Sequence, residues 1–288
     1  MEDGQASFTA LAAAAARAAH LVVDREPVIF ADTLAAPLLG ERADELLSYH
    51  TRHGAHPVLA GARTQAACRS RYTEDALARA TGRGVTQYVI LGAGLDSFAY
   101  RNRAGRLQVF EVDHPATQDW KRGAIAAARI GVPDSVTFVP ADLAIDSPAG
   151  RLAAAGFDTT APALVSWLGV TMYLTRDAVA ATLAEFGGLA AGTEVIADYM
   201  LPAELRDEAG AGYADQVAQA SAERGEPWLS CFAPGEMTGL ARAAGFGDVR
   251  HVRQRDAIPA ALWERSDPLR PADLAVLFHG TVAAASGA

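Results

Sequence analysis

The segment VTQYVILGAGLDS, residues 85–97, decides the fold, because a run of β-branched and aromatic residues leads directly into a turn with two glycines. The composition of residues 85–91 predicts a buried strand that ends at Leu91. Gly92 and Gly94 then allow the backbone to approach a ligand closely. An ordinary tight turn has the same pattern, so the motif alone is weak evidence of a binding site.

Strand and helix patterns alternate after this turn. Strands are predicted at 106–114, 135–143, 161–169 and 193–202, with helices at 117–131 and 176–192. This alternation indicates a parallel sheet with helices on both faces, and residues 85–202 would form its cofactor-binding core.

The segments on either side of this core differ from it. Residues 1–84 contain four helical patterns, at 8–23, 32–40, 41–50 and 62–84, and are predicted to form an N-terminal helical segment. Residues 203–230 are polar and helical in pattern, which predicts a lid insertion over the sheet edge. Residues 231–288 return to the sheet, with a helix at 233–246, a strand at 247–253 and an edge or antiparallel strand at 274–283. We expect a single domain over the whole chain.

The composition limits the possible functions. Half of the 288 residues are hydrophobic and a fifth are charged, which is typical of a folded globular protein. The formal net charge of −9 repels phosphate backbones and anionic lipid heads, so we expect a small-molecule acceptor, no nucleic acid and no membrane. No run of about 18 apolar residues is present, and charged residues interrupt the first apolar stretch, which predicts a cytoplasmic protein. Cys68 and Cys231 stand apart from any Cys/His cluster, so no metal site is predicted.

The second predicted strand ends in an acidic residue, Asp113, about 20 residues beyond the glycine turn. An acid at this place reaches ribose hydroxyls, which indicates a cofactor that contains adenosine. The full dinucleotide fingerprint requires a third glycine where Ser97 and Phe98 stand, so S-adenosylmethionine (SAM), which carries no phosphate, fits better than a nicotinamide cofactor. After the third strand, Asp142 could accept from an adenine amino group with Leu143 on the ring, or it could cap a helix.

Five ordered segments resemble the leucine carboxyl methyltransferase family, particularly its bacterial branch, and the resemblance runs from about Ala10 to Phe278. They are CRSRY (68–72), VILGAGLDSFAYR (89–101), FEVDHP (110–115), PADL (140–143) and WLGVTMYLT (167–175). The resemblance implies the class I SAM-dependent methyltransferase fold. This is a Rossmann-like α/β fold with a seven-stranded doubly wound sheet whose last pair of strands is partly antiparallel.

The resemblance also implies roles for individual residues. Arg69 would pair with the methionine carboxylate of SAM, with Arg71 as the neighbouring alternative. Gly92 would line the methionine moiety, Asp113 would hold the ribose, and Asp142 with Leu143 would hold the adenine. Ala93, Gly94 and His114 complete the expected cofactor-binding set.

Family members that methylate a protein C-terminus tend to carry an acidic residue where this chain has Leu168. A protein phosphatase acceptor is therefore not expected. The resemblance instead implies O-methylation of a carboxylate or hydroxyl on a small, polyketide-like molecule of secondary metabolism. Two other hypotheses stay open at this point: a SAM-binding protein that catalyses a non-methylating reaction, and, less favoured, a nicotinamide-dependent oxidoreductase.

The catalytic residues are not evident from the sequence. A carboxylate acceptor needs no base, whereas a hydroxyl acceptor does, and no Ser-His-Asp or His-Glu constellation is visible. His114, Tyr173 and Tyr199 are candidates, because they follow or end predicted strands, and Trp228 of the lid is another possible pocket residue. Arg17 and Arg25 could clamp an anionic acceptor, although a solvated helix face is the favoured interpretation for both.

Overall fold

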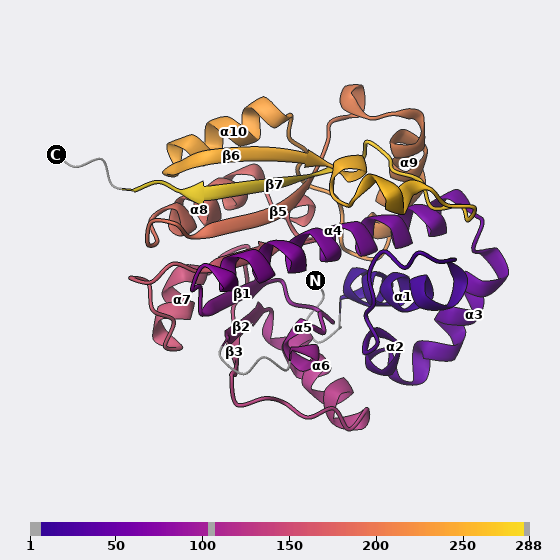
Figure 1. The fold of residues 1–288 in the computed structure, drawn as a ribbon, viewed down its shortest axis with the longest axis horizontal. Coiled ribbons are helices and arrows are strands. Elements are labelled where there is room, and N and C mark those ends of the chain that lie inside the picture. The colour runs from indigo at the N-terminus through magenta and orange to yellow at the C-terminus, as the bar shows by residue number, and fades with distance from the viewer. Residues whose placement is uncertain (1–6, 103–106, 285–288) are drawn as a thin grey trace.

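The structure, a computed structural model, describes residues 7–102 and 107–284. Its centre is a seven-stranded sheet in the order β3-β2-β1-β4-β5-β7-β6 (Figure 1). The strands are β1 (Gln87–Leu91), β2 (Gln108–Asp113), β3 (Val136–Pro140), β4 (Leu164–Trp167), β5 (Glu194–Met200), β6 (Phe246–Arg253) and β7 (Ala275–Val282). Strands β1 to β5 are parallel, and β7 runs antiparallel to both of its neighbours. The predicted mixed, seven-stranded sheet is confirmed.

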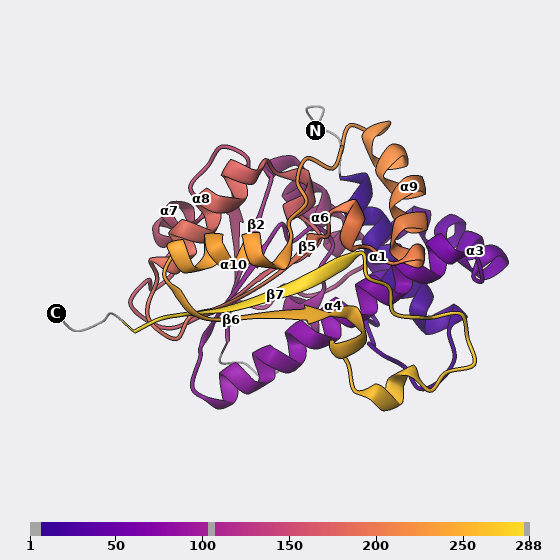
Figure 2. The same ribbon diagram turned by 90° about the horizontal axis from the view of Figure 1, so that it is seen from above.

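Helices cover both faces of the sheet because side chains alternate along each strand. In β1, Val89 and Leu91 belong to one buried cluster, and Tyr88 and Ile90 to another. The first cluster packs against α7 (Pro148–Ala154), α8 (Arg176–Gly187) and α10 (Pro234–Ala243). The second packs against α4 (Pro57–Gly82) and α5 (Phe98–Arg101), and Figure 2 shows α4 on the opposite side of the sheet from α8 and α10.

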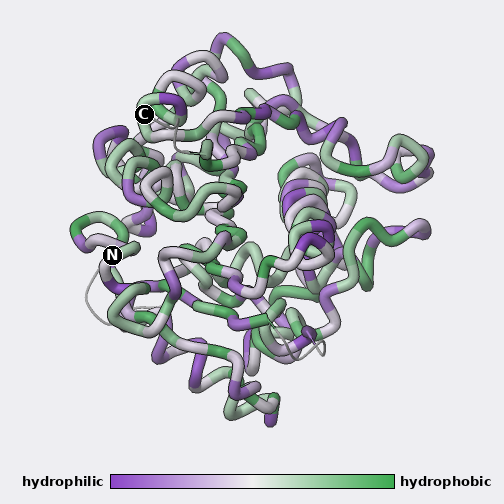
Figure 3. Tube along the Cα trace, turned by 60° about the vertical axis from the view of Figure 1, so that its left-hand side comes forward, coloured by the Kyte–Doolittle hydropathy of each residue, from purple (hydrophilic) through white to green (hydrophobic). Residues whose placement is uncertain are grey.

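The remaining helices are α1 (Phe8–Val23), α2 (Ala35–Leu38), α3 (Ala43–His53), α6 (Pro115–Ala127) and α9 (Glu208–Ala222). A third buried cluster joins α1 and α2 to Ile125 of α6. Hydrophobic and hydrophilic stretches alternate along the chain in Figure 3, as expected of elements that bury only one face.

Several element boundaries differ from the predictions. Helix α4 begins five residues before the predicted 62, because the His56 side chain accepts from the Val58 amide and Pro57 stands at the first helical position. Helix α7 was not predicted; Ser147 caps it through the Gly150 amide, and Pro148 follows. Strand β7 lies inside the sheet between β5 and β6, so the edge alternative for 274–283 is wrong and the antiparallel alternative is correct.

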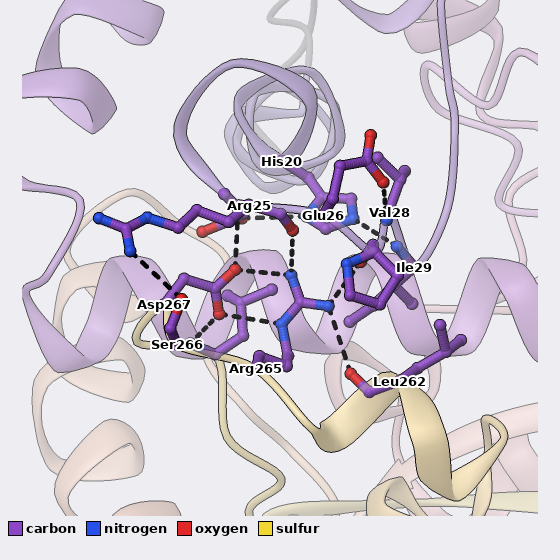
Figure 4. A network of polar contacts seen from close by, with 12 residues as sticks. His20, Arg25, Glu26, Val28, Ile29, Leu262, Arg265, Ser266 and Asp267 are labelled. Atoms are coloured by element: carbon purple, nitrogen blue, oxygen red, sulfur yellow. Dashed lines mark hydrogen bonds and ion pairs between the residues drawn. The ribbon is translucent and has the colours of Figure 1, made fainter.

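A buried polar network fastens residues 24–29, after α1, to residues 262–269 near the end of the chain. Arg265 donates to both carboxylate oxygens of Asp267, at 2.9 and 2.6 Å, and to the carbonyl oxygens of Arg25, Pro27 and Leu262 (Figure 4). The Arg25 amide donates to Asp267 at 2.9 Å. These contacts hold the N-terminal helices beside the sheet.

Candidate functional site

A cavity of about 560 Å³ opens where β1, β2, β3 and β4 end, a size typical of small-molecule sites. Ligands of open α/β sheets bind at this edge, outside the carboxyl ends of the strands. The turn after β1 lines the cavity, together with part of α1, part of α4, residues 225–227 and Leu229.

The glycine turn is joined to β2 by its backbone. The amides of Gly92 and Ala93 both donate to the Val112 carbonyl, at 2.8 and 3.1 Å. Gly92 and Gly94 have φ values of +65° and +43°, which favour glycine. A Cβ atom on Gly92 would clash with Val170, and one on Gly94 would lie 3.0 Å from the Cβ of Ala10 in α1. The two glycines therefore also let Val170 and Ala10 of α1 pack directly against the turn.

Asp113 connects the glycine turn to α6. Its two carboxylate oxygens accept from the amides of Gly94, at 2.5 Å, and His114, at 2.7 Å. Burial raises the pKa of Asp113, and these backbone hydrogen bonds oppose the rise. Each oxygen keeps a further lone pair, so the carboxylate can accept from ligand hydroxyls.

Asp142 and Leu143 follow β3 and line the cavity. The Asp142 carboxylate accepts from the Ala144 amide at 2.9 Å, so it caps a turn, whereas Ser147 caps the helix that follows. Asp142 is therefore not the N-cap of a helix, as the alternative interpretation predicted.

Arg69 projects from α4 to the end of β4. Its Nη1 donates to Asp198 of β5 at 2.9 Å, and the other oxygen of Asp198 accepts from the Gly169 amide at 2.5 Å. Gly169 has a φ of +73°, and a Cβ atom there would lie 2.7 Å from Arg69 Nη2. The guanidinium can occupy this place because residue 169 has no side chain.

Arg71 points elsewhere. It donates to Asp75 at 2.7 Å and to the Ile29 carbonyl at 3.3 Å, and it is absent from the described residues that line the cavity. Because neighbouring helical residues face different directions, only one of the two predicted arginines can reach the cavity. The structure contradicts Arg71 as the alternative to Arg69.

The three catalytic candidates occupy different environments. His114 and Tyr173 line the cavity. His114 Nδ1 also accepts from the Ala116 amide at 3.3 Å and caps α6. Tyr199 is fully buried beside Phe232, and its hydroxyl pairs with His251 Nδ1 at 2.9 Å. It points into the core, so its prediction as a pocket residue is wrong.

Trp228 packs with Met172 and Tyr213 in a small cluster and is absent from the described cavity lining. The Arg25 guanidinium donates a hydrogen bond to the Ser266 hydroxyl at an exposed position. The solvated interpretation is wrong for Arg17, which is 8% exposed and donates to Asp32 at 2.8 Å and to the Leu95 carbonyl at 2.6 Å. Burial raises the pKa of Asp32, but Arg17, Ser97 and Arg101 lower it more, so the net shift is downward.

The sequence did not single out Thr117, Asp198 or Glu226. The Thr117 hydroxyl is buried at the cavity and has no hydrogen-bond partner within residues 7–102 and 107–284. Such a buried, unpaired polar atom fits a polar ligand. Asp198 had a readable signal, because a carboxylate within an apolar strand requires a buried partner.

The N-terminus of α1 meets residues 223–229 at the mouth of the cavity. The Thr9 amide donates to Glu226 Oε2 at 3.1 Å, and the Arg224 guanidinium lies 4.4 Å from the centre of the Phe8 ring. Burial raises the pKa of Tyr173, and hydrogen bonding with Ser221 and Thr9 opposes the rise. These contacts place part of the predicted lid over the cavity, whereas its movement stays a prediction.

Residues 7–102 and 107–284 contain no group of three or more His, Cys, Asp or Glu side chains placed to hold a metal ion. Within the same residues, none of the helices combines the length and the apolar character needed to cross a membrane.

Comparisons with known proteins agree with this geometry. The family model described as leucine carboxyl methyltransferase matches residues 10–187. A Bacillus subtilis protein named "Putative S-adenosyl-L-methionine-dependent methyltransferase YktD" is 30% identical, over 93% of this chain and 95% of that protein.

Two solved structures share the fold. A DUF574 family protein from Streptomyces avermitilis has a TM-score of 0.59 at 16% identity, covering 98% of this chain and 99% of its own. A protein from Thermobifida fusca titled "putative methyltransferase" has a TM-score of 0.56 at 18% identity, covering 90% of this chain and 97% of its own.

Proposed function

The chain belongs to the leucine carboxyl methyltransferase family and is a SAM-dependent methyltransferase, and from this premise we propose that it methylates an oxygen atom of a small-molecule acceptor. The acceptor atom belongs to a carboxylate or a hydroxyl group. The cavity supports this proposal because its volume of about 560 Å³ is typical of small-molecule sites and because residues 223–229 with α1 border its mouth.

The observation that carries the cofactor site, on which the proposal depends, is the bridging position of Asp113. Its carboxylate already orders the glycine turn and the start of α6, and its remaining lone pairs can accept from the ribose hydroxyls of SAM. On the same side, Asp142 would accept from the adenine amino group with Leu143 on the ring. The His114 backbone and the unpaired Thr117 hydroxyl lie between these two acids in the chain.

The methionine end would lie toward β4. Arg69 has guanidinium donors beyond its bond to Asp198 and would bind the methionine carboxylate. The backbone of Gly92, Ala93 and Gly94 would line the chain between this carboxylate and the ribose.

Bound SAM supplies an electrophilic methyl group that needs no acid catalyst. The protein therefore has to align the acceptor oxygen and exclude water. The turn after β4 and Tyr173 are placed to do the first, and the contact of Glu226 with α1 is placed to do the second.

Calorimetric titration with SAM and S-adenosylhomocysteine tests the proposal. We expect binding to the unaltered protein and about 10- to 100-fold weaker binding to Asp113→Asn, because hydrogen bonds to a charged group are lost. Asp119→Asn is the matched control, since Asp119 is an exposed residue of α6. Failure of the unaltered protein to bind either ligand would contradict the proposed function.

A further inference from the structure

The cations that line the cavity already have partners. Among the described lining residues, the guanidinium groups are those of Arg17 and Arg69. Arg17 is paired with Asp32 and the Leu95 carbonyl. Arg69 is paired with Asp198 and, under the proposed function, also takes the methionine carboxylate. Neither is left to neutralise an acidic acceptor.

His114 and Tyr173 are both engaged within the protein. His114 Nδ1 accepts from the Ala116 amide at 3.3 Å. Tyr173 has a raised pKa, mainly through burial, and is an uncharged phenol at neutral pH.

A negative charge lies at the acceptor end instead. Glu226 lines the cavity and is only partly exposed. One of its oxygens is fixed by the Thr9 amide at 3.1 Å, and its charge acts on Tyr173, which also lines the cavity. A carboxylate acceptor brought beside Glu226 would meet a like charge, and neither arginine of the described lining is free to offset it. The sulfonium of SAM is the positive charge that remains at this end, and S-adenosylhomocysteine lacks it.

The rest of this end is apolar. Val170 and Leu174 of the segment after β4 face the cavity, as do Ala10 and Ala13 of α1. Leu229 lines the mouth and is 53% exposed. These side chains suit an apolar body, while Glu226 can accept a hydrogen bond from a single polar group on it.

We propose that the acceptor is a neutral, largely apolar molecule that presents a hydroxyl group, and that Glu226 accepts the hydrogen bond from this hydroxyl and disfavours carboxylates. As the methyl group passes from the sulfur of SAM to the hydroxyl oxygen and S-adenosylhomocysteine forms, Glu226 takes up the hydroxyl proton. The proposal deepens the proposed function, because it assumes that the cavity is the site of methyl transfer. It selects hydroxyl over carboxylate chemistry from the charges that the described residues place there.

Equilibrium binding of a matched pair of probes tests it. 1-Naphthol and 1-naphthoate share an apolar body and differ in the polar group, and each is titrated at pH 7.5 into the protein with and without S-adenosylhomocysteine. We expect the unaltered protein to bind 1-naphthol at least about tenfold more tightly than 1-naphthoate. In Glu226→Gln the amide oxygen can keep the contact with Thr9 but the charge is gone, so the preference should fall about tenfold.

Glu223→Gln is the matched control, because it removes the same charge from a neighbouring exposed position that bonds to Gln219. It should keep the preference. An equal affinity for the two probes, a preference for 1-naphthoate, binding of neither probe, or the same preference in Glu226→Gln would overturn the proposal.

Product chemistry provides a second readout. Methyl groups transferred from radiolabelled SAM to hydroxyl acceptors form ethers that survive mild alkali, whereas methyl esters release volatile methanol. Alkali-labile product from 1-naphthoate in excess of stable product from 1-naphthol would overturn the acceptor class while leaving the proposed function intact. Absence of S-adenosylhomocysteine binding would contradict the proposed function, and the probe comparison without that ligand would still test Glu226.

Discussion

Arg265 and Arg69 are both paired with an aspartate inside the protein, but their other donors differ. Arg265 makes five hydrogen bonds, two to Asp267 and three to backbone carbonyls, and its side chain is fully buried. Arg69 makes one hydrogen bond within the part of the chain that the structure describes, and its side chain is 17% exposed at the cavity. A guanidinium has five N–H donors. The saturated arginine therefore stabilises the fold, and the unsaturated one is available to a ligand.

Arg265→Ala should have the largest effect, and it acts on stability. It leaves Asp267 buried without its partner, and removal of one member of a buried pair costs about 3–5 kcal/mol. Urea denaturation measures the loss. Arg250→Ala is the control, because its pair with Asp248 is exposed and should contribute under about 1 kcal/mol. If Arg265→Ala also lost less than about 1 kcal/mol, Arg265 would not stabilise the fold, and the distinction between Arg265 and Arg69 would fail.

Arg63, like Arg265, is a buried arginine paired with an aspartate, here Asp24, and His50 contacts it. Burial first, and then Arg63, lowers the pKa of His50 to about 4. In the unfolded chain His50 therefore takes up a proton near pH 6.5, whereas in the folded protein it does so only near pH 4. Stability is lost as the pH falls from about 6.5 to 4, by up to about 3 kcal/mol from this group.

Denaturation of His50→Gln over this pH range checks the contribution. Its stability should depend less on pH than that of the unaltered protein. The neighbouring exposed His53, changed to Gln, should leave the pH dependence intact. Parallel curves for His50→Gln and the unaltered protein would mean that His50 does not act in this way.

Arg69→Lys should have the smallest effect, and it acts on binding. Lysine keeps the charge but loses the planar pair of donors, so affinity for S-adenosylhomocysteine should fall about tenfold, or about 1.4 kcal/mol. Calorimetry measures this change. Arg71→Lys should bind normally, because Arg71 points away from the cavity. Equal losses in the two variants would remove the basis for assigning Arg69 alone.

Local sequence patterns predicted most of the sheet. Each strand of β1 to β5 is a short apolar run bounded by turn residues, and the glycine turn stands directly after β1. The position of β7 could not be read in this way, because strand order depends on contacts between distant segments. Helix α7 was missed because seven residues are too few for a clear period.

Whether a site residue could be predicted from the sequence depends on its position relative to the strands. Residues at or just beyond the carboxyl ends of strands, such as Gly92, Asp113 and Asp142, all line the cavity, because parallel strands end at one edge. Tyr199 lies within β5, where the direction of one side chain is set by the sheet as a whole. Glu226 and Thr117 have no sequence signal, since only the fold brings their segments to the cavity.

The interior position of β7 has a consequence for protein synthesis. Strand β6 is made before β7, yet among the described strands it pairs with β7 alone, which in turn pairs with β5. While the ribosome is still translating residues 275–282, β5 has an open edge and β6 has no neighbour to join. Until β7 emerges and enters between them, the edges of β5 and β6 are therefore exposed to pairing with other proteins.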